Sequence, residues 1–319
     1  MMRKVAKSIT FAFKQNNKLC TSRQISYGVH IGNQQNDLKG QYNSGQLFIH
    51  KKLGYRGVVL YPCQAKIYDD RDISVTPDGS LDVIKLPAEE IYYQVLVDLE
   101  DTSMEGAGNE ECIFMAQKGE LKPQILNGFG FVAHEDMLPY TSTVSDWPVE
   151  HAEFENFFTY NFKEVPNCRP RAHLNNWKKK CKMHLQEPLN VYVACTHGIK
   201  VTVMPSLVDV IPILDDQNKY IWVYCIRIEN TNKEQVQLRS RHWHISGGPN
   251  QTVNGKGVVG QEPILNMNRP TFQYRSYVEL HTSNGYMWGA YTMEKKNGDM
   301  IKVKIPVFLL RTHDFLETN

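Results

Sequence analysis

The segment "YIWVYCIRI", residues 220–228, is apolar on both of the faces that a β-strand would present. One face would carry Tyr220, Trp222, Tyr224, Ile226 and Ile228, and the other Ile221, Val223 and Cys225. Successive side chains of a strand point to opposite sides, so a strand with two apolar faces must be covered on both. The segment therefore predicts a central strand of a layered β-structure.

Further runs with a period of two residues follow Asn190 and surround this strand. They are "IKVTVMP", "EQVQLRSRHWHIS", "TFQYRSYVEL", "GYMWGAYTME" and "DMIKVKIPVFLL". The stretches "SNG" and "KNGD" lie between runs and are typical of hairpin turns. About six or seven strands within this length predict an immunoglobulin-like or fibronectin-III-like β-sandwich over residues 190–313.

A second β-rich block precedes the sandwich, over residues 41–145. Its apolar runs are "QLFIH", "YRGVVLYP", "IYYQVLVDLE", "ECIFMA" and "GFVAHEDML". Glycines and prolines interrupt any longer helix, and the runs are short. We therefore predict a small, strongly bent β-barrel here, and a mainly-β chain as a whole.

Residues 146–189 form a connector with a different period. Phe154, Phe157, Phe158 and Phe162 recur at helical spacing after "SDWP", which predicts a first helix with Asp146 or Ser145 as its N-cap. A second helix is predicted from about Pro170 to Leu185, with Trp177 in its apolar stripe and "KKKCK" opposite. We expect a helical connector between two β domains.

The stretch "GKGVVG" matches the glycine pattern that holds a dinucleotide pyrophosphate, through Gly255, Gly257 and Gly260. That pattern needs a strand before it and a helix after it, because the phosphate binds at the helix N-terminus. Gln261, Glu262 and Pro263 follow the glycines instead. We expect a structural loop in which glycine allows positive φ; the alternative is a loop whose amides bind an anion.

The first 36 residues contain no acidic residue, and their basic residues are Arg3, Lys4, Lys7, Lys14, Lys18 and Arg23. Wound as a helix, they separate an apolar face from a cationic one, which is typical of a mitochondrial presequence. Without these six, residues 37–319 hold 30 Lys+Arg against 34 Asp+Glu, a net charge of −4. Such a body lacks the general positive field that drives binding to phosphate backbones. No apolar stretch is long enough to span a membrane.

Several motifs are specific enough to indicate families. "GQLFIHKKLGYRGVVLYP", "YYQVLVDLED" and "FVAHEDMLPYTS" resemble a YccV-like domain, of the hemimethylated-DNA-binding type. "QLRSRHWHIS", "GKGVVGQEPIL", "FQYRSYVELHTSNGYMWGAYTME" and "VKIPVFLL" resemble an ApaG domain, a fibronectin-III-like sandwich. The two in this order resemble the polymerase-delta-interacting protein 2 family, over about residues 45–310.

That resemblance implies an adaptor without enzymatic activity, in the mitochondrial matrix and also in the nucleus. The partners it implies are the accessory subunit of polymerase delta, the sliding clamp and the mitochondrial AAA+ unfoldase-protease. The alternative is a DNA-binding protein of the YccV type. "QEPLNVYV", residues 186–193, partly matches a clamp-binding motif, but it also opens the first sandwich strand, and burial would prevent its docking.

Tyr55, Arg56 and Trp177 are the candidate partner-binding residues. Tyr55 and Arg56 lie between Gly54 and Gly57, so they either form an exposed binding surface or belong to a hairpin shaped by the glycines. The lysine run Lys178, Lys179, Lys180 and Lys182 is either a solvated helix face or a patch for nucleic acid or an acidic partner.

His242 and His244 alternate on a predicted strand and so face the same side, at a spacing that suits two metal ligands. The sequence shows no third ligand, and we predict neither a metal site nor a cofactor. The seven cysteines form no C-x-x-C pair, which favours free thiols. We identify no catalytic residue, because the sequence shows no acid–base pair, metal cluster or phosphate loop.

Overall fold

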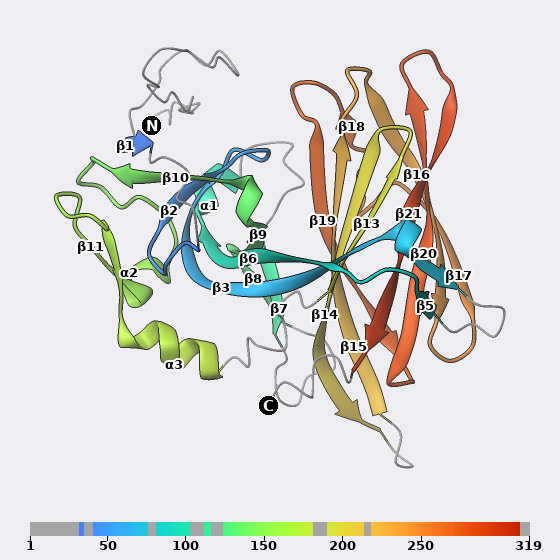
Figure 1. The fold of residues 1–319 in the computed structure, drawn as a ribbon, viewed down its shortest axis with the longest axis horizontal. Helices are drawn as coiled ribbons and strands as arrows, with labels where there is room; N and C mark the ends of the chain where they lie inside the picture. The colour runs from blue at the N-terminus through green and yellow to red at the C-terminus, as the bar shows by residue number, and fades with distance from the viewer. Residues whose placement is uncertain are drawn as a thin grey trace, which may run out of the picture.

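The structure is a computed structural model that describes residues 32–34, 41–75, 81–102, 112–115, 124–180, 190–213 and 218–312. Most of the predicted presequence, and Lys182 of the lysine run, lie outside these ranges. The described chain is mainly β, with two β blocks in the predicted order, joined by a connector (Figure 1).

The N-terminal block is one bent sheet with the strand order β1–β10–β2–β3–β6–β9. Its strands are β1 (Gly32–Gln34), β2 (Leu47–His50), β3 (Arg56–Asp69), β6 (Ala88–Val97), β9 (Phe129–Ala133) and β10 (Met137–Ser142). The 3₁₀ turn η2 (His134–Asp136) leads from β9 into β10. No ladder joins β9 to β10 in the part of the chain that the structure describes, so the predicted closure into a barrel is not found there.

Short elements surround this sheet. They are η1 (Asp70–Asp72), β4 (Ile73–Val75), β5 (Leu81–Val83), α1 (Leu99–Thr102), β7 (Cys112–Met115) and β8 (Gln124–Asn127). The sheet is buried on both faces: Val58 and Leu60 belong to one apolar cluster, and Val59 belongs to another with Tyr93 and Val95. Two buried faces explain why the runs of this block read as nearly continuous apolar stretches.

The connector contains less helix than its sequence predicts. The first helix, α2, is only Phe154–Phe157, and it starts after Glu153 rather than at Asp146. It ends because the next residues form β11 (Phe158–Tyr160), which pairs with β12 (Cys168–Pro170). The second predicted helix is present as α3 (Ala172–Lys180), and residues 181–189 lie outside the described residues.

The C-terminal block is the predicted sandwich. One layer contains β13 (Asn190–Thr196), β14 (Ile199–Pro212), β15 (Asn218–Asn230) and β19 (Thr271–Leu280). The other contains β16 (Val236–Ser246), β17 (Gln251–Lys256), β18 (Ile264–Leu265), β20 (Asn284–Lys295) and β21 (Met300–Arg311). Residues 220–228, predicted as a central strand, lie in β15, which pairs with β14 on one side and β19 on the other.

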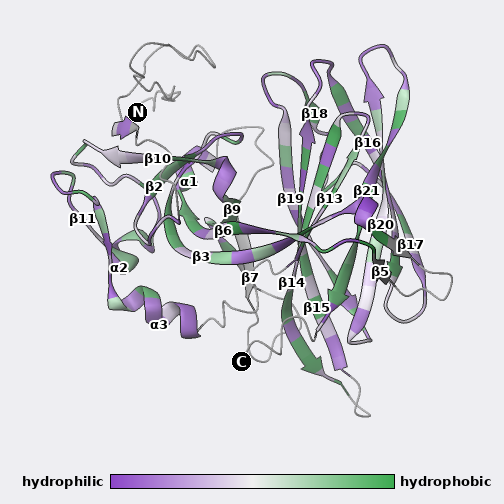
Figure 2. Ribbon diagram, viewed as in Figure 1, coloured by the Kyte–Doolittle hydropathy of each residue, from purple (hydrophilic) through white to green (hydrophobic). Residues whose placement is uncertain are grey.

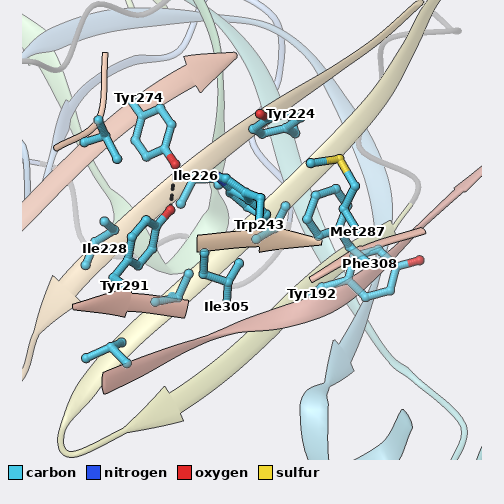
Figure 3. Close-up of a cluster of buried hydrophobic side chains, with 14 of the residues drawn as sticks. Tyr192, Tyr224, Ile226, Ile228, Trp243, Tyr274, Met287, Tyr291, Ile305 and Phe308 are labelled. Carbon is cyan, nitrogen blue, oxygen red and sulfur yellow. Dashed lines mark hydrogen bonds between the residues drawn. The ribbon is translucent and has the colours of Figure 1, made fainter. Parts of the chain in front are cut away.

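Large aromatic side chains fill the space between the two layers (Figure 3). Trp243 of β16 lies 5.7 Å from Tyr224 of β15, ring centre to ring centre, and Phe308 lies 6.0 Å from Trp243. Tyr274 and Tyr291 share a hydrogen bond of 2.6 Å across the layers. Figure 2 shows hydrophobic and hydrophilic residues alternating along several of these strands, as expected where one face of a sheet is buried.

The two blocks share one continuous sheet. The far end of β3 pairs in parallel with β13, from Lys66 opposite Asn190 to Asp69 opposite Val193. Tyr68 of β3 stacks on Tyr192 of β13 with ring centres 5.2 Å apart. The long strand β3 therefore belongs to the core of the N-terminal block at one end and to the sandwich at the other (Figure 1).

Candidate partner-binding surface

Of the two alternatives for Tyr55 and Arg56, the structure has the hairpin shaped by glycines and not the exposed surface. Tyr55 is 3% exposed and packs against Phe48 and His50, with ring centres 6.4 and 5.0 Å away. Gly54 just before it has φ +80°, so the glycines shape the turn between β2 and β3, as the structural alternative stated. Tyr55 is thus a core residue of the N-terminal block.

Arg56 is held by two carboxylates instead of facing a partner. Its Nη2 lies 2.9 Å from Asp98 Oδ2, and its Nε lies 2.8 Å from Asp101 Oδ2. Burial disfavours the charge of Arg56, but Asp101 and then Asp98 outweigh it and raise its pKa. Burial, and then the neighbouring Asp101, raise the pKa of Asp98. The positive charge of Arg56 offsets part of this rise. Arg56, Asp98 and Asp101 thus form a structural ion cluster at the beginning of α1.

Asp98 also fixes the start of the connector. Its Oδ2 accepts a hydrogen bond of 3.0 Å from the backbone N–H of Glu150, and its Oδ1 accepts from Glu100 and Asp101 at the beginning of α1. The connector therefore leaves the N-terminal block at a defined point, tied to a carboxylate that is 1% exposed.

The third candidate, Trp177, is half-buried on α3. It stacks on Phe129 of β9 with ring centres 4.9 Å apart and lies 5.2 Å from Phe157 of α2. The next residue, Lys178, places its ammonium 3.9 Å from the centre of the Tyr61 ring. These contacts hold α3 against the N-terminal block, and they leave Lys179 exposed.

Among its described residues, the connector exposes three large apolar side chains that the sequence analysis did not propose as binding residues. Val165 is 73% exposed, Trp147 45% and Phe162 37%. Trp147 lies 5.9 Å from Tyr160 of β11, ring centre to ring centre, and Phe162 follows Tyr160 by two residues. Below we call Trp147, Phe162 and Val165 the connector surface. Exposed aromatic residues in one region are typical of protein-binding sites.

The turn that carries Phe162 and Val165 is held in place by a buried amide. The side chain of Asn167, 5% exposed, accepts a hydrogen bond of 2.7 Å from the N–H of Ser142. It donates to the carbonyls of Ser142, at 3.1 Å, and Glu164, at 2.9 Å. A turn fixed in this way loses little freedom when a partner binds.

The glycine stretch "GKGVVG" is a structural loop, as expected. Gly255 lies on β17, Gly257 and Gly260 have φ of +55° and +78°, and the chain continues into a tight turn with Val258 paired to Gln261. A Cβ on Gly257 would lie 2.2 Å from the Gln261 carbonyl oxygen. No helix follows, so the dinucleotide interpretation does not apply.

His242 and His244 lie on the same face of β16, as predicted, on the side opposite the buried Trp243. Their Nε2 atoms are 2.9 Å apart. Among the described residues, no group of three or more His, Cys, Asp or Glu side chains could hold a metal ion. In the weak clamp-binding motif, Tyr192 is fully buried, so this motif is not available for docking, as expected.

Comparison with known proteins agrees with this architecture. Residues 213–295 match the family model described as the ApaG domain. The chain is 39% identical to polymerase delta-interacting protein 2 of Mus musculus over 287 residues, which cover 86% of this chain and 77% of the relative. The Homo sapiens protein of the same name is 38% identical over 287 residues, which again cover 86% of this chain and 77% of the relative. The chain belongs to the polymerase delta-interacting protein 2 family.

Bacterial proteins named ApaG match the C-terminal block of this chain over nearly their whole length. Protein ApaG of Brucella canis is 41% identical over 122 residues, which cover 38% of this chain and 92% of that protein. Within the described residues, no helix is long and apolar enough to cross a bilayer. In this chain, the ApaG match covers the C-terminal block.

Proposed function

We propose that the chain is a non-enzymatic adaptor that binds folded protein partners through the connector surface. The observation that carries this proposal is the exposure of Trp147, and of Phe162 and Val165 on a turn fixed by the buried Asn167. The two β blocks on either side are joined by a shared sheet and provide a rigid frame. Membership of the family supports an interaction role, since its relatives carry the name polymerase delta-interacting protein.

The first partner we propose is the accessory subunit of DNA polymerase delta, and the others are the sliding clamp and the mitochondrial AAA+ unfoldase-protease. Because Tyr192 is buried, a clamp would have to contact a surface other than residues 186–193. We propose the mitochondrial matrix, and also the nucleus, as the location. An import assay with charge-reversed Lys4, Lys7 and Lys14 tests the mitochondrial part: loss of import supports it, and unchanged import contradicts it.

The test of the adaptor function is a binding titration with the purified polymerase delta accessory subunit. Trp147→Ala and Phe162→Ala should each weaken binding by about 1–4 kcal/mol, the usual cost of truncating an interface anchor. Tyr277→Ala is the matched control, because Tyr277 is a 41% exposed aromatic residue on the sandwich edge strand β19. Equal affinities for all four proteins would contradict the proposal.

The second candidate, duplex DNA binding, rests on the basic side of α3. Lys179 is exposed there, whereas Lys178 lies over the Tyr61 ring. Binding to phosphates would fall steeply as salt rises and would depend on Lys178, Lys179 and Lys180. Salt-sensitive DNA binding of that kind, together with no binding of the accessory subunit, would favour the DNA-binding function over the adaptor.

A further inference from the structure

The outer face of the five-stranded sandwich layer carries a pair of imidazoles in an unusual arrangement. His242 and His244 face outward from β16, and their rings stand nearly perpendicular, at 79°, with centres 4.5 Å apart. The Nε2 atoms of the two rings face each other at 2.9 Å. Both side chains are half-exposed, so an ion from solvent reaches them without any change in the core.

Neighbouring strands hold the orientation of each ring. Asn254 of β17 lies opposite His242, and its Oδ1 is hydrogen-bonded to His242 Nδ1. Since an amide oxygen only accepts, Nδ1 of His242 carries the proton and its Nε2 has a free lone pair. His244 stacks on Trp288 of β20, with ring centres 4.7 Å apart and planes 13° apart. Partners of this kind are what metal-binding histidines use to fix their tautomer and direction.

We propose that His242 and His244 form a chelating site for a divalent transition-metal ion that prefers square-planar or tetragonal coordination, with copper bound best. With metal–nitrogen bonds of about 2.0 Å, two nitrogens 2.9 Å apart subtend about 90° at the ion. The observed separation therefore fits adjacent positions of a square-planar ion. Among the divalent first-row metal ions, copper binds nitrogen ligands most strongly.

Binding requires a proton shift within the pair and a rotation of the two rings, because the Nε2 atoms are hydrogen-bonded to each other and both lone pairs must converge on the ion. Before metal binding, His244 Nε2–H donates to His242 Nε2, because the latter carries the free lone pair. The metal takes the lone pairs of both Nε2 atoms, and the proton of His244 moves to its Nδ1. The remaining coordination positions face solvent and are filled by water. Since only neutral imidazole binds metal, binding weakens in acid.

Copper titration of the full chain tests this site. Trp288, stacked on His244, provides the signal, because its fluorescence should fall as copper binds. We expect one copper per chain, bound more tightly than zinc, with an electron paramagnetic resonance spectrum showing two nitrogen ligands. His242→Ala and His244→Ala should abolish this binding, and Asn254→Ala should weaken it about 10–100-fold.

Two further variants complete the test. His281→Ala removes an exposed histidine that follows β19, and it should leave copper binding unchanged. Trp288→Phe should keep the two-nitrogen spectrum while reducing the fluorescence change. The chain has eleven histidines, so the comparison between variants decides the outcome. Copper binding that survives in both His242→Ala and His244→Ala, or zinc binding tighter than copper, would overturn the proposal.

Discussion

Asp136 takes part in the electrostatic contact between the two blocks. It lies in η2 of the N-terminal block and is 1% exposed. Arg227 of the sandwich strand β15 is ion-paired with it, and Lys52 lies 3.0 Å away. Burial alone would raise the pKa of Asp136, but Arg227 and Lys52 outweigh it and hold the pKa at about 2.

This depressed pKa predicts how stability changes with pH. An unfolded aspartate has a pKa of about 3.9, so the charged form of Asp136 stabilises the fold by about 2 kcal/mol at neutral pH. That contribution is fully present above about pH 4 and is lost as the pH falls toward about 2. In urea unfolding at pH 6, the free energy of unfolding of Asp136→Asn should therefore be well below that of the wild type. This difference in free energy should shrink as the pH falls. A constant difference would contradict the assigned charge.

Gly257 is a residue where conformation and space both exclude a side chain. Gly257→Val forces a branched residue to φ +55° and places its Cβ against the Gln261 carbonyl, at a cost of about 1–3 kcal/mol. The matched variant Gly260→Ala has open space around its Cβ and should cost about 1 kcal/mol. Thermal melts measure both.

Calorimetry should show no NAD binding by the wild type. Saturable NAD binding that is lost in Gly257→Val would refute the assignment of this stretch as a structural loop.

For single residues, the sequence predicted what a side chain can do chemically better than whether that side chain is buried. The residue types of Tyr55 and Arg56 suit an interface, but Tyr55 packs on Phe48, and Arg56 is paired with Asp101, which lies 45 residues away in the sequence. The shared face of His242 and His244 could be predicted because alternation along a strand is local. Their nitrogen separation could not, because it depends on Asn254 and Trp288 of neighbouring strands.

Among the elements, the connector shows where local periodicity fails. The phenylalanine spacing predicted one helix through Phe162, whereas α2 ends at Phe157 because Phe158–Tyr160 pairs with Cys168–Pro170. Pairing between distant segments overrides a local helical pattern. The same hairpin exposes Phe162 and Val165. The connector surface could therefore not be predicted from the helical spacing of the phenylalanines. The second helix was predictable, because its pattern continues through α3 without such competition.

The attachment of α3 should depend on Trp177. Trp177→Ala removes the stack on Phe129 and the contact with Phe157, and we expect a loss of about 2–4 kcal/mol, near the lower range for truncated aromatic core residues. Amide hydrogen exchange should then be faster across α3. Lys179→Ala, on the exposed side of the helix, is the control and should change little. Unchanged stability in Trp177→Ala would show that other contacts hold the helix.

In the whole molecule, the two blocks are less separate than the sequence suggested. Both were predicted in the right order, but the parallel pairing of β3 with β13 joins segments more than 100 residues apart. Parallel strands need a long connection, and nothing local in either strand specifies the partner. The ion pairs of Asp136 with Arg227, and of Lys52 with Glu229 at 2.8 Å, add to this contact.

This shared structure predicts that both blocks unfold together. Calorimetry of the wild type should show one cooperative transition. Arg227→Met removes the positive charge that is paired with the buried Asp136. It should lower the free energy of unfolding by about 3–5 kcal/mol. The double variant Arg227→Met/Asp136→Leu removes both charges and should recover much of that loss. Two separate transitions in the wild type would show that the blocks are independent.

Hydrogen exchange measures whether the partner binds at the connector surface. The chain is measured alone and in complex with the polymerase delta accessory subunit, and the protection of each segment is compared. We predict new protection over residues 147–165, with the outer face of β16 and β20 unchanged. Protection confined to the sandwich, with residues 147–165 exchanging as in the free chain, would contradict the account.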